Sequence, residues 1–284
     1  FVSNSKDYLV AGRGLPLYMS TATVFATWFG AETVLSVSAT FVKDGLGGIP
    51  ADPFGASFCL VFVALFFARA FYRMDLLTIG DFYKKRYGKG VEVLTSLAVT
   101  LSYLGWTSAQ LTALGIVFNS LSQGAISLDQ GILIGAVIVL IYTTFGGMWS
   151  VALTDLFQSV VIVLGLLYVA FLVSGMAGGV GKVVAHASEA GKFQFWPTGG
   201  SKEWWLFAGA WITMAIGSIP QQDVFQRVTS AKNENTAVKG SLLGALAYFC
   251  FAFVPIFLAY AALLVDPKMV EPLLQSEGRE VQLI

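Results

Sequence analysis

Long apolar runs dominate the pattern of the chain, and short polar connections, many of them rich in glycine, separate them. A helix that crosses a membrane needs about 20 predominantly apolar residues. The apolar run at 150–176 follows the run at 125–145 so closely that the two are expected to form a tight antiparallel pair of helices. The pattern predicts an all-α membrane protein with about seven transmembrane helices, at residues 15–42, 52–72, 91–121, 125–145, 150–176, 204–225 and 237–265.

The first and the sixth of these runs are interrupted near their middle. They read TVFATWFGAETVLS at 23–36 and WITMAIGSIPQQDVF at 211–225. In lipid, a broken helix is tolerated only where the freed backbone groups line a cavity or face other protein. Two interrupted spans at corresponding places of two halves are typical of a transporter's binding site. We therefore expect unwinding at 26–30 and at 217–220, with the two breaks meeting near the middle of the membrane.

The composition agrees with a membrane location. The 284 residues are 56% hydrophobic and 12% charged, whereas soluble domains average about 25% charged residues. The net charge of zero gives a nucleic-acid partner no electrostatic support. The chain has no P-loop, HExxH motif or CxxC pair, so no enzyme activity is expected. We predict a multi-pass protein of the cell inner (plasma) membrane whose partners are the lipid bilayer and a small solute, with the oligomeric state left open.

Four ionisable side chains lie within or beside the apolar runs, where such groups usually face a bundle interior or a water-filled path. Glu32 follows the first break, and it is interpreted either as a helix cap or as a group that contacts a solute. Asp155 is either an acid at a helix start or a stopping point for a cation near the cytoplasmic mouth. Asp223 and Arg227 are four residues apart, a spacing that favours an ion pair on one helical face.

The first break also offers backbone oxygen. Unwinding frees the carbonyl groups from Ala26 to Phe29, and carbonyl oxygens are suitable ligands for a small hard cation such as sodium. Trp28 lies within this break, and Trp106 lies in the middle of the third run. Two tryptophans beside a cavity can stack on a solute or hold an ammonium group by cation–π attraction, although a single tryptophan in a span is more often a packing residue.

Three further polar residues complete the predicted solute site. Gln110 follows Trp106 by one helical turn, so both are expected to face the same side. Gln221 follows the second break and can form hydrogen bonds with a polar solute. Thr33 lies one position after Glu32.

Four segments of the chain resemble the sodium/solute symporter family, and the similarity runs along nearly the whole sequence. They are KDYLVAGRGL (6–15), LLTIGDFYKKRYG (76–88), IYTTFGGMWSVALTDLFQ (141–158) and IPQQDVFQRVTSAKN (219–233). The resemblance implies a partial LeuT-type bundle with inverted repeats, in which the first and sixth helices are broken. It also implies one transporter domain over 1–284 that is truncated at both ends, with a first five-helix repeat at 15–176 and the first two helices of a second repeat at 204–265.

The family resemblance further implies sodium-coupled secondary active transport by alternating access. In the family, one sodium ion lies between the first broken helix and the third helix of the second repeat. The matching positions are the carbonyl groups of Ala26 and Phe29, and the partner helix is expected beyond Ile284. The family's acid on the sodium release route matches Asp155.

The solute is left with alternatives. ATWFG (26–30) and WTSAQLTALG (106–115) resemble choline-transporter-like bacterial members, where Trp28 and Trp106 match two aromatic residues of the choline cage. Ala56 and Gln221 stand at the other two cage positions. An amino acid or another small organic ion is the favoured solute, read partly by Gln221, Thr33 and Glu32. Choline or another quaternary ammonium ion is one alternative, and a symporter-like sensor domain of a signalling protein is another.

Overall fold

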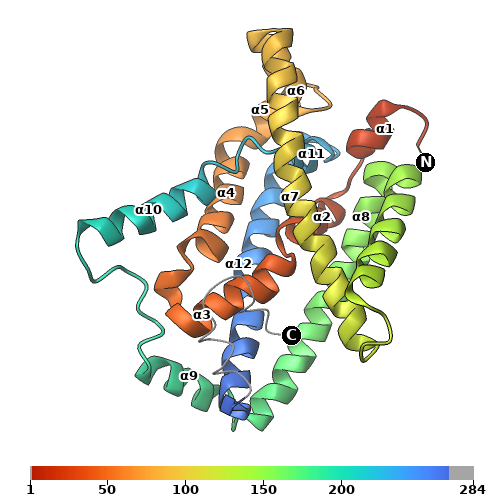
Figure 1. Cartoon of the computed structure of the whole chain (residues 1–284). Coiled ribbons are helices and arrows are strands. Elements are labelled where there is room, and N and C mark those ends of the chain that lie inside the picture. The colour runs from red at the N-terminus through yellow and green to blue at the C-terminus, as the bar shows by residue number, and fades with distance from the viewer. Residues whose placement is uncertain (1, 269–284) are drawn as a thin grey trace.

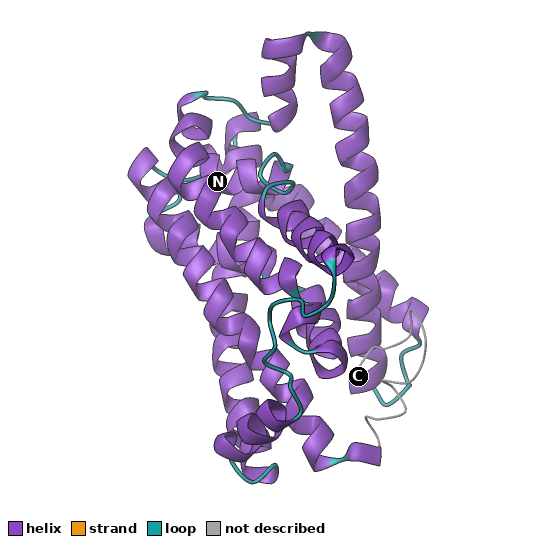
Figure 2. Ribbon diagram, turned by 90° about the vertical axis from the view of Figure 1, so that its left-hand side faces the viewer, coloured by secondary structure: helices purple, strands orange, loops and turns teal. Residues whose placement is uncertain are grey.

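The chain folds as a bundle of helices in the computed structural model, which describes residues 2–268 (Figures 1 and 2). The only extended pairing in that range is an isolated bridge between Leu15 and Ala231. The elements are α1 (Ser5–Val10), η1 (Ala11–Arg13), α2 (Leu17–Trp28), η2 (Glu32–Val37), α3 (Ser38–Asp44), η3 (Leu46–Gly48), η4 (Pro50–Gly55), α4 (Ala56–Phe62), η5 (Val63–Phe67), α5 (Ala68–Arg73), α6 (Ile79–Tyr87), α7 (Lys89–Leu121), α8 (Leu128–Met176), α9 (Val180–Glu189), α10 (Ser201–Ala215), α11 (Gln222–Thr229) and α12 (Glu234–Val265).

Helices occupy all seven predicted runs. Three continuous helical segments of the described residues are long and apolar enough to cross a membrane, namely Pro50–Arg73, Leu128–Met176 and Glu234–Val265. Leu17–Trp28 and Glu32–Asp44 pass the same test together, and a bend of 56° separates them. This bent pair is the predicted broken first span. The third run forms α7, and the sixth run forms α10 and α11 with a non-helical connection between them.

The long element α8 consists of two arms that meet at Gly147. This residue has φ 51° and ψ −145°, which is not a helical conformation. In Figure 1 the ribbon reverses its direction at this place, so the arms correspond to the fourth and fifth predicted runs. A Cβ atom at Gly147 would lie 2.5 Å from the carbonyl oxygen of Tyr8, so the reversal also lets α1 approach closely. The expected tight antiparallel pair is confirmed.

Helix α12 lies at the centre of the bundle, where it packs against α2, α3, α4, α5 and α8. Small residues allow this contact, as is common between membrane helices. A Cβ atom at Gly240 would lie 2.5 Å from the hydroxyl oxygen of Ser20, and one at Gly244 would lie 2.5 Å from a side-chain carbon of Val24. These glycines let α12 pack closely against the part of α2 that precedes the first break.

One end of the bundle joins segments that are far apart in the sequence. The backbone N–H of Leu15 donates to the carbonyl oxygen of Ser230 at 3.1 Å, and the N–H of Lys232 donates to the carbonyl oxygen of Leu15 at 2.9 Å. The N–H of Ile79 donates to Oε1 of Gln222 at 2.8 Å. With the contact between Gly147 and Tyr8, all four segments that carry the family resemblance meet at this end.

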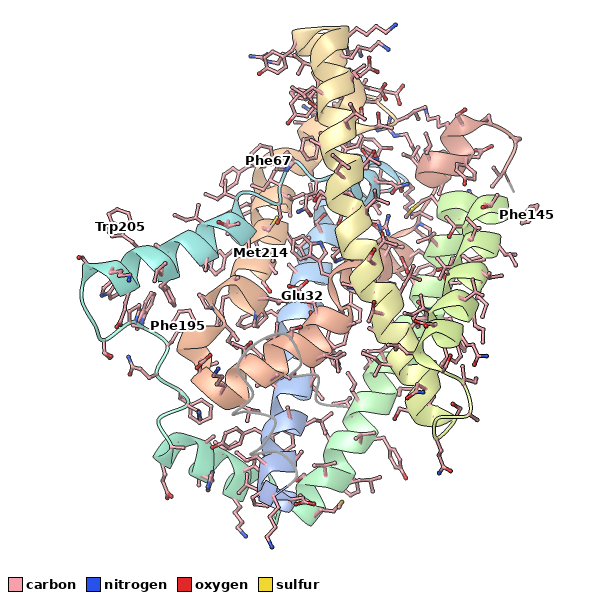
Figure 3. The ribbon with its side chains drawn as sticks, viewed as in Figure 1. Glu32, Phe67, Phe145, Phe195, Trp205 and Met214 are labelled. Atoms are coloured by element: carbon pink, nitrogen blue, oxygen red, sulfur yellow. The ribbon has the colours of Figure 1, made fainter. Side chains whose placement is uncertain are left out.

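Large apolar side chains cover much of the outer surface of α7, α8 and α10. Phe145 and Trp205 are 81% and 78% exposed, and Figure 3 shows them at opposite edges of the molecule. Leu101 on α7 and Phe171 on α8 are 68% and 75% exposed. Extensive apolar surface of this kind indicates contact with lipid or with further protein.

Candidate functional site

The first helix break lies between α2 and η2. Helix α2 continues to Trp28, because the N–H of Phe29 still donates to the carbonyl oxygen of Phe25 at 2.9 Å. The non-helical residues are Phe29 and Gly30, so the prediction that unwinding begins at residue 26 was wrong by about one helical turn. The freed carbonyl groups nevertheless include part of the predicted set. The N–H of Gly30 donates to Trp28 at 3.1 Å, not to Ala26, so the carbonyl oxygen of Ala26 lacks its helical donor.

Gln110 on α7 holds the other side of this break. Its Oε1 accepts a hydrogen bond from the N–H of Ala31 at 3.3 Å. The N–H of Ala31 would otherwise donate to the carbonyl oxygen of Thr27 in a continuous helix. The side chain of a distant helix therefore takes over one bond of the helical ladder at the place where the chain bends.

The second break separates α10, which ends at Ala215, from α11, which begins at Gln222. Pro220 has no N–H to donate and disfavours helix at Ile219. The N–H of Ile219 donates to Ile216 at 3.2 Å, as in a turn and not as in an α-helix. The predicted break at 217–220 is confirmed.

The two breaks open on one cavity of about 410 Å³, and α7 forms its third wall. Figure 3 shows Glu32 near the centre of the molecule, at this place. The residues that line the cavity include Thr27, Trp28, Gly30 and Glu32 beside the first break, Ser102, Tyr103, Trp106 and Gln110 on α7, Met214, Ser218, Pro220, Gln221 and Asp223 near the second break, and Asp52.

Five of the six predicted solute-binding residues line this cavity. Trp28 and Glu32 lie beside the first break, Trp106 and Gln110 face it from adjacent turns of α7, and Gln221 lies beside the second break. No side-chain hydrogen bond caps the helix at Glu32, and the residue is exposed to the cavity. The interpretation of Glu32 as a helix cap is therefore not supported.

The sixth predicted residue, Thr33, lies behind the cavity wall and is fully buried. Its hydroxyl is 3.3 Å from the carbonyl oxygen of Trp28, 3.3 Å from Oδ2 of Asp52 and 3.0 Å from the hydroxyl of Tyr248. The Tyr248 hydroxyl donates to Oδ1 of Asp52. Three elements, η2, η4 and α12, thus meet at the Asp52 carboxylate.

The three residues predicted to contact sodium lie in two places, the first break and the second arm of α8. The carbonyl groups of Ala26 and Phe29 belong to the first break, where the ring of Phe29 stacks on Phe25 at 5.1 Å. Asp155 lies on the second arm of α8, outside the cavity wall. Its Oδ2 atom is buried and has no hydrogen-bond partner within residues 2–268.

The spacing argument for an ion pair between Asp223 and Arg227 was wrong. The Asp223 carboxylate accepts a hydrogen bond from the hydroxyl of Tyr103, and that hydroxyl accepts one from the Asp223 N–H at 3.1 Å. Arg227 instead donates through Nε to Oγ1 of Thr27 at 2.8 Å. Each side chain finds its partner on a different helix, which spacing along one helix does not reveal.

Sequence reasoning missed Asp52, Tyr103 and Tyr248. Asp52 is the only acidic or basic side chain between Asp44 and Arg69, and an ionisable group at the start of an apolar run is the signal that points to it. The two tyrosines lie within apolar runs, and only the fold brings their hydroxyl groups to the carboxylates.

Comparison with known proteins gives a consistent result. The model of the "Sodium:solute symporter family" matches residues 8–280. The chain is 27% identical over 282 residues to the high-affinity choline transporter 1 of Caenorhabditis elegans, covering 99% of this chain and 47% of the relative. It is 29% identical to the human protein of the same name over 259 residues, covering 89% of this chain and 44% of the relative. It is 25% identical over 286 residues to the sodium/glucose cotransporter of Vibrio parahaemolyticus, covering 95% of this chain and 52% of the relative.

A solved structure shares the fold. It is the substrate-bound outward-open state of a Na⁺-coupled sialic acid symporter, with a TM-score of 0.81 and 18% sequence identity over 97% of this chain and 59% of that chain. The chain spans about half of the length of the curated relatives that it matches. Because the family model covers nearly all residues, the chain belongs to the sodium:solute symporter family, whose members are membrane transporters and not enzymes.

Proposed function

We propose that the chain is part of a sodium-coupled symporter that carries a small organic solute through the plasma membrane by alternating access. The observation that carries this proposal is the cavity that both helix breaks share with α7. A cavity between broken helices supplies backbone groups for an ion and side chains for a solute in the same place. Movement of the broken helices against α7 and α8 would open it to one side or the other.

Sodium is a transported ion in this proposal, and the first break supplies backbone ligands for it. The carbonyl groups of Ala26 and Phe29 are the proposed ligands, and the missing helical donor of Ala26 supports this role. A neutral carbonyl group binds a cation without adding a buried charge of its own. Asp155 is proposed to receive sodium on its way to the cytoplasm, which its buried and unpartnered Oδ2 atom supports.

The solute is proposed to lie between Trp28 and Trp106, with polar contacts to Glu32, Gln110 and Gln221. Thr33 acts from behind the wall through its contact with Asp52. One charge that moves through 100 mV supplies about 2.3 kcal/mol. The sodium gradient adds to this free energy, so coupling to one ion is enough to concentrate an organic solute.

A quaternary ammonium ion is the second candidate solute. Two of the relatives are named choline transporters, and the two tryptophans that match the choline cage both line the cavity. Ala56, at a third cage position, is buried among Phe25, Phe29 and Tyr248 and presents no aromatic ring. Half of the cage is therefore absent, and an amino acid or another organic ion remains the first candidate.

The test is a solute screen with the complete encoded protein in liposomes. Radiolabelled amino acids, organic amines, choline, sugars and monocarboxylates are offered with and without an inward sodium gradient. We expect accumulation of one class above its external concentration only when the gradient is present, and loss of most of this uptake in Trp106→Ala. Uptake that is equal with and without sodium, or absent for every solute, would contradict the proposal.

A further inference from the structure

Among the described residues, every charged side chain that lines the cavity is acidic. Three carboxylates line it, those of Glu32, Asp52 and Asp223, and no lysine, arginine or histidine of the described residues does so. The guanidinium group of Arg227 does not line the cavity, but it donates to the hydroxyl of Thr27, which does, and to the neighbouring Gln226. One such group leaves the three carboxylates in excess. The aromatic rings of Trp28, Tyr103 and Trp106 form much of the remaining wall. Such a wall attracts a cation and repels an organic anion.

Asp52 is the most deeply placed of the three acids, and it is 8% exposed. The hydroxyl of Tyr248 donates to one carboxylate oxygen, and that of Thr33 lies within hydrogen-bond distance of the other. No ion pair among residues 2–268 includes Asp52. A buried carboxylate is costly unless an opposite charge accompanies it. Two hydroxyl donors lower this cost without removing the preference for a cation.

Several features favour an organic ammonium group over a metal ion beside Asp52. Among residues 2–268, no group of three or more His, Cys, Asp or Glu side chains is arranged to hold a metal ion. The cavity of about 410 Å³ is far larger than one ion requires. The ring of Trp28 packs edge to face against Tyr248 at 6.3 Å, so an aromatic face lies next to the acid. Carboxylate and aromatic face together suit a cation with an N–H group and a carbon skeleton.

We propose that Asp52, held by Tyr248 and Thr33, binds the protonated amine of a small cationic organic solute. This inference rests on the proposed function and narrows its first candidates, an amino acid or another organic ion, to an organic cation with a protonated amine. An N–H bond of the ammonium group donates to Asp52, and the carbon skeleton lies against Trp28 and Trp106. A quaternary ammonium ion has no N–H to donate and forfeits this hydrogen bond. An amino acid adds a carboxylate for which the described wall offers no base.

The test compares matched solutes on the complete encoded protein in liposomes. Primary amines from ethanolamine to tyramine are each paired with the N-trimethylated, carboxylate and alcohol analogues, and the liposomes carry an inward sodium gradient. Asp52→Asn keeps the shape of the side chain and removes its charge. Asp129→Asn, the same change at an exposed acid on α8 outside the cavity, is the matched control.

We expect sodium-driven uptake of primary amines, with a preference of about tenfold over the trimethylated analogues, because a charge-assisted hydrogen bond is lost in the latter. Asp52→Asn should raise KM for the amine about tenfold or more and leave the sodium concentration for half-maximal uptake unchanged. It should also reduce the preference for primary amines over their trimethylated analogues. The Asp129→Asn control should behave as the wild type.

Three results would overturn the inference. Sodium-driven uptake of carboxylates or neutral solutes without amines would do so and would leave the proposed function intact. An Asp52→Asn protein with altered sodium activation and an unchanged amine KM would assign Asp52 to the ion. Absence of sodium-driven uptake for every solute in this panel and in the wider screen would contradict both proposals. If Asp52→Asn does not fold, the preference of the wild type for amines over their analogues decides the question.

Discussion

At the scale of single residues, Asp75 connects the second span to the N-terminal segment. It accepts hydrogen bonds from Lys6, at 3.3 Å, and from Arg13. The guanidinium group of Arg13 also lies 3.8 Å from the centre of the Tyr72 ring and donates to the Tyr72 carbonyl oxygen. The hydrogen bonds from Lys6 and Arg13, with their charges, hold the pKa of Asp75 below its ordinary value. The carboxylate is exposed, so solvent screens much of this effect.

This lowered pKa predicts a pH-dependent contribution to stability. Because the folded state holds the charged form of Asp75, the contribution is full above the unfolded pKa of about 3.9 and is lost as the pH falls through the lower folded pKa. In thermal unfolding, we expect Asp75→Asn to melt a few degrees at most below the wild type at pH 7, and we expect this difference to shrink progressively as the pH falls below about 3.9. Glu189→Gln, at an exposed acid on α9, should show no such convergence. A difference that does not change with pH would contradict the assignment.

Residue types in apolar runs predicted part of the site. Trp28 could be predicted because it is an aromatic residue at a helix break. Trp106 and Gln110 could be predicted because they lie one helical turn apart in an apolar run and so face the same side. Asp52 and Tyr248 could not be paired from the sequence, because 196 residues separate them and only the packing of η4 against α12 joins them. Contacts between distant elements decide which polar groups act together.

At the scale of elements, the apolar runs predicted the helices well and the exact bend less well. The run at 23–36 contains a break, but the break begins only at Phe29, because the helical bond from Phe29 to Phe25 is kept. The bend is then stabilised by Gln110, a residue of another helix. Local sequence predicts where a helix is weak, and tertiary contacts decide at which residue it opens.

The reversal within α8 depends on Gly147, which has a positive φ and lies against the backbone of Tyr8. We expect Gly147→Ala to lower stability by about 1–3 kcal/mol from backbone strain, with further loss from the contact that its Cβ would make. The measurement is thermal unfolding of the purified protein together with its yield. Gly165→Ala, on the second arm of α8 with open space around it, should be neutral or stabilising by up to about 1 kcal/mol. Equal behaviour of the two variants would contradict this account of the reversal.

At the scale of the whole molecule, two regions of the bundle differ in what they contain. One end of the bundle joins the four segments that carry the family resemblance, through bonds such as those between Leu15 and residues 230 and 232. The middle holds the cavity between the two breaks and α7. The family could be predicted from the four segments, whereas the acidic character of the cavity required the fold, because its three carboxylates come from three separate parts of the chain.

The central claim is that both breaks enclose one site for one solute, and thiol protection tests it directly. Thr27→Cys and Ser218→Cys place one thiol beside each break, in a Cys250→Ser background because Cys250 is the exposed cysteine. Each variant is labelled with a small methanethiosulfonate reagent at rising concentrations of a transported solute, with sodium present. We predict that both thiols are protected with the same half-protecting concentration and that protection weakens when sodium is removed. Protection of only one thiol, or at two different concentrations, would contradict the shared site.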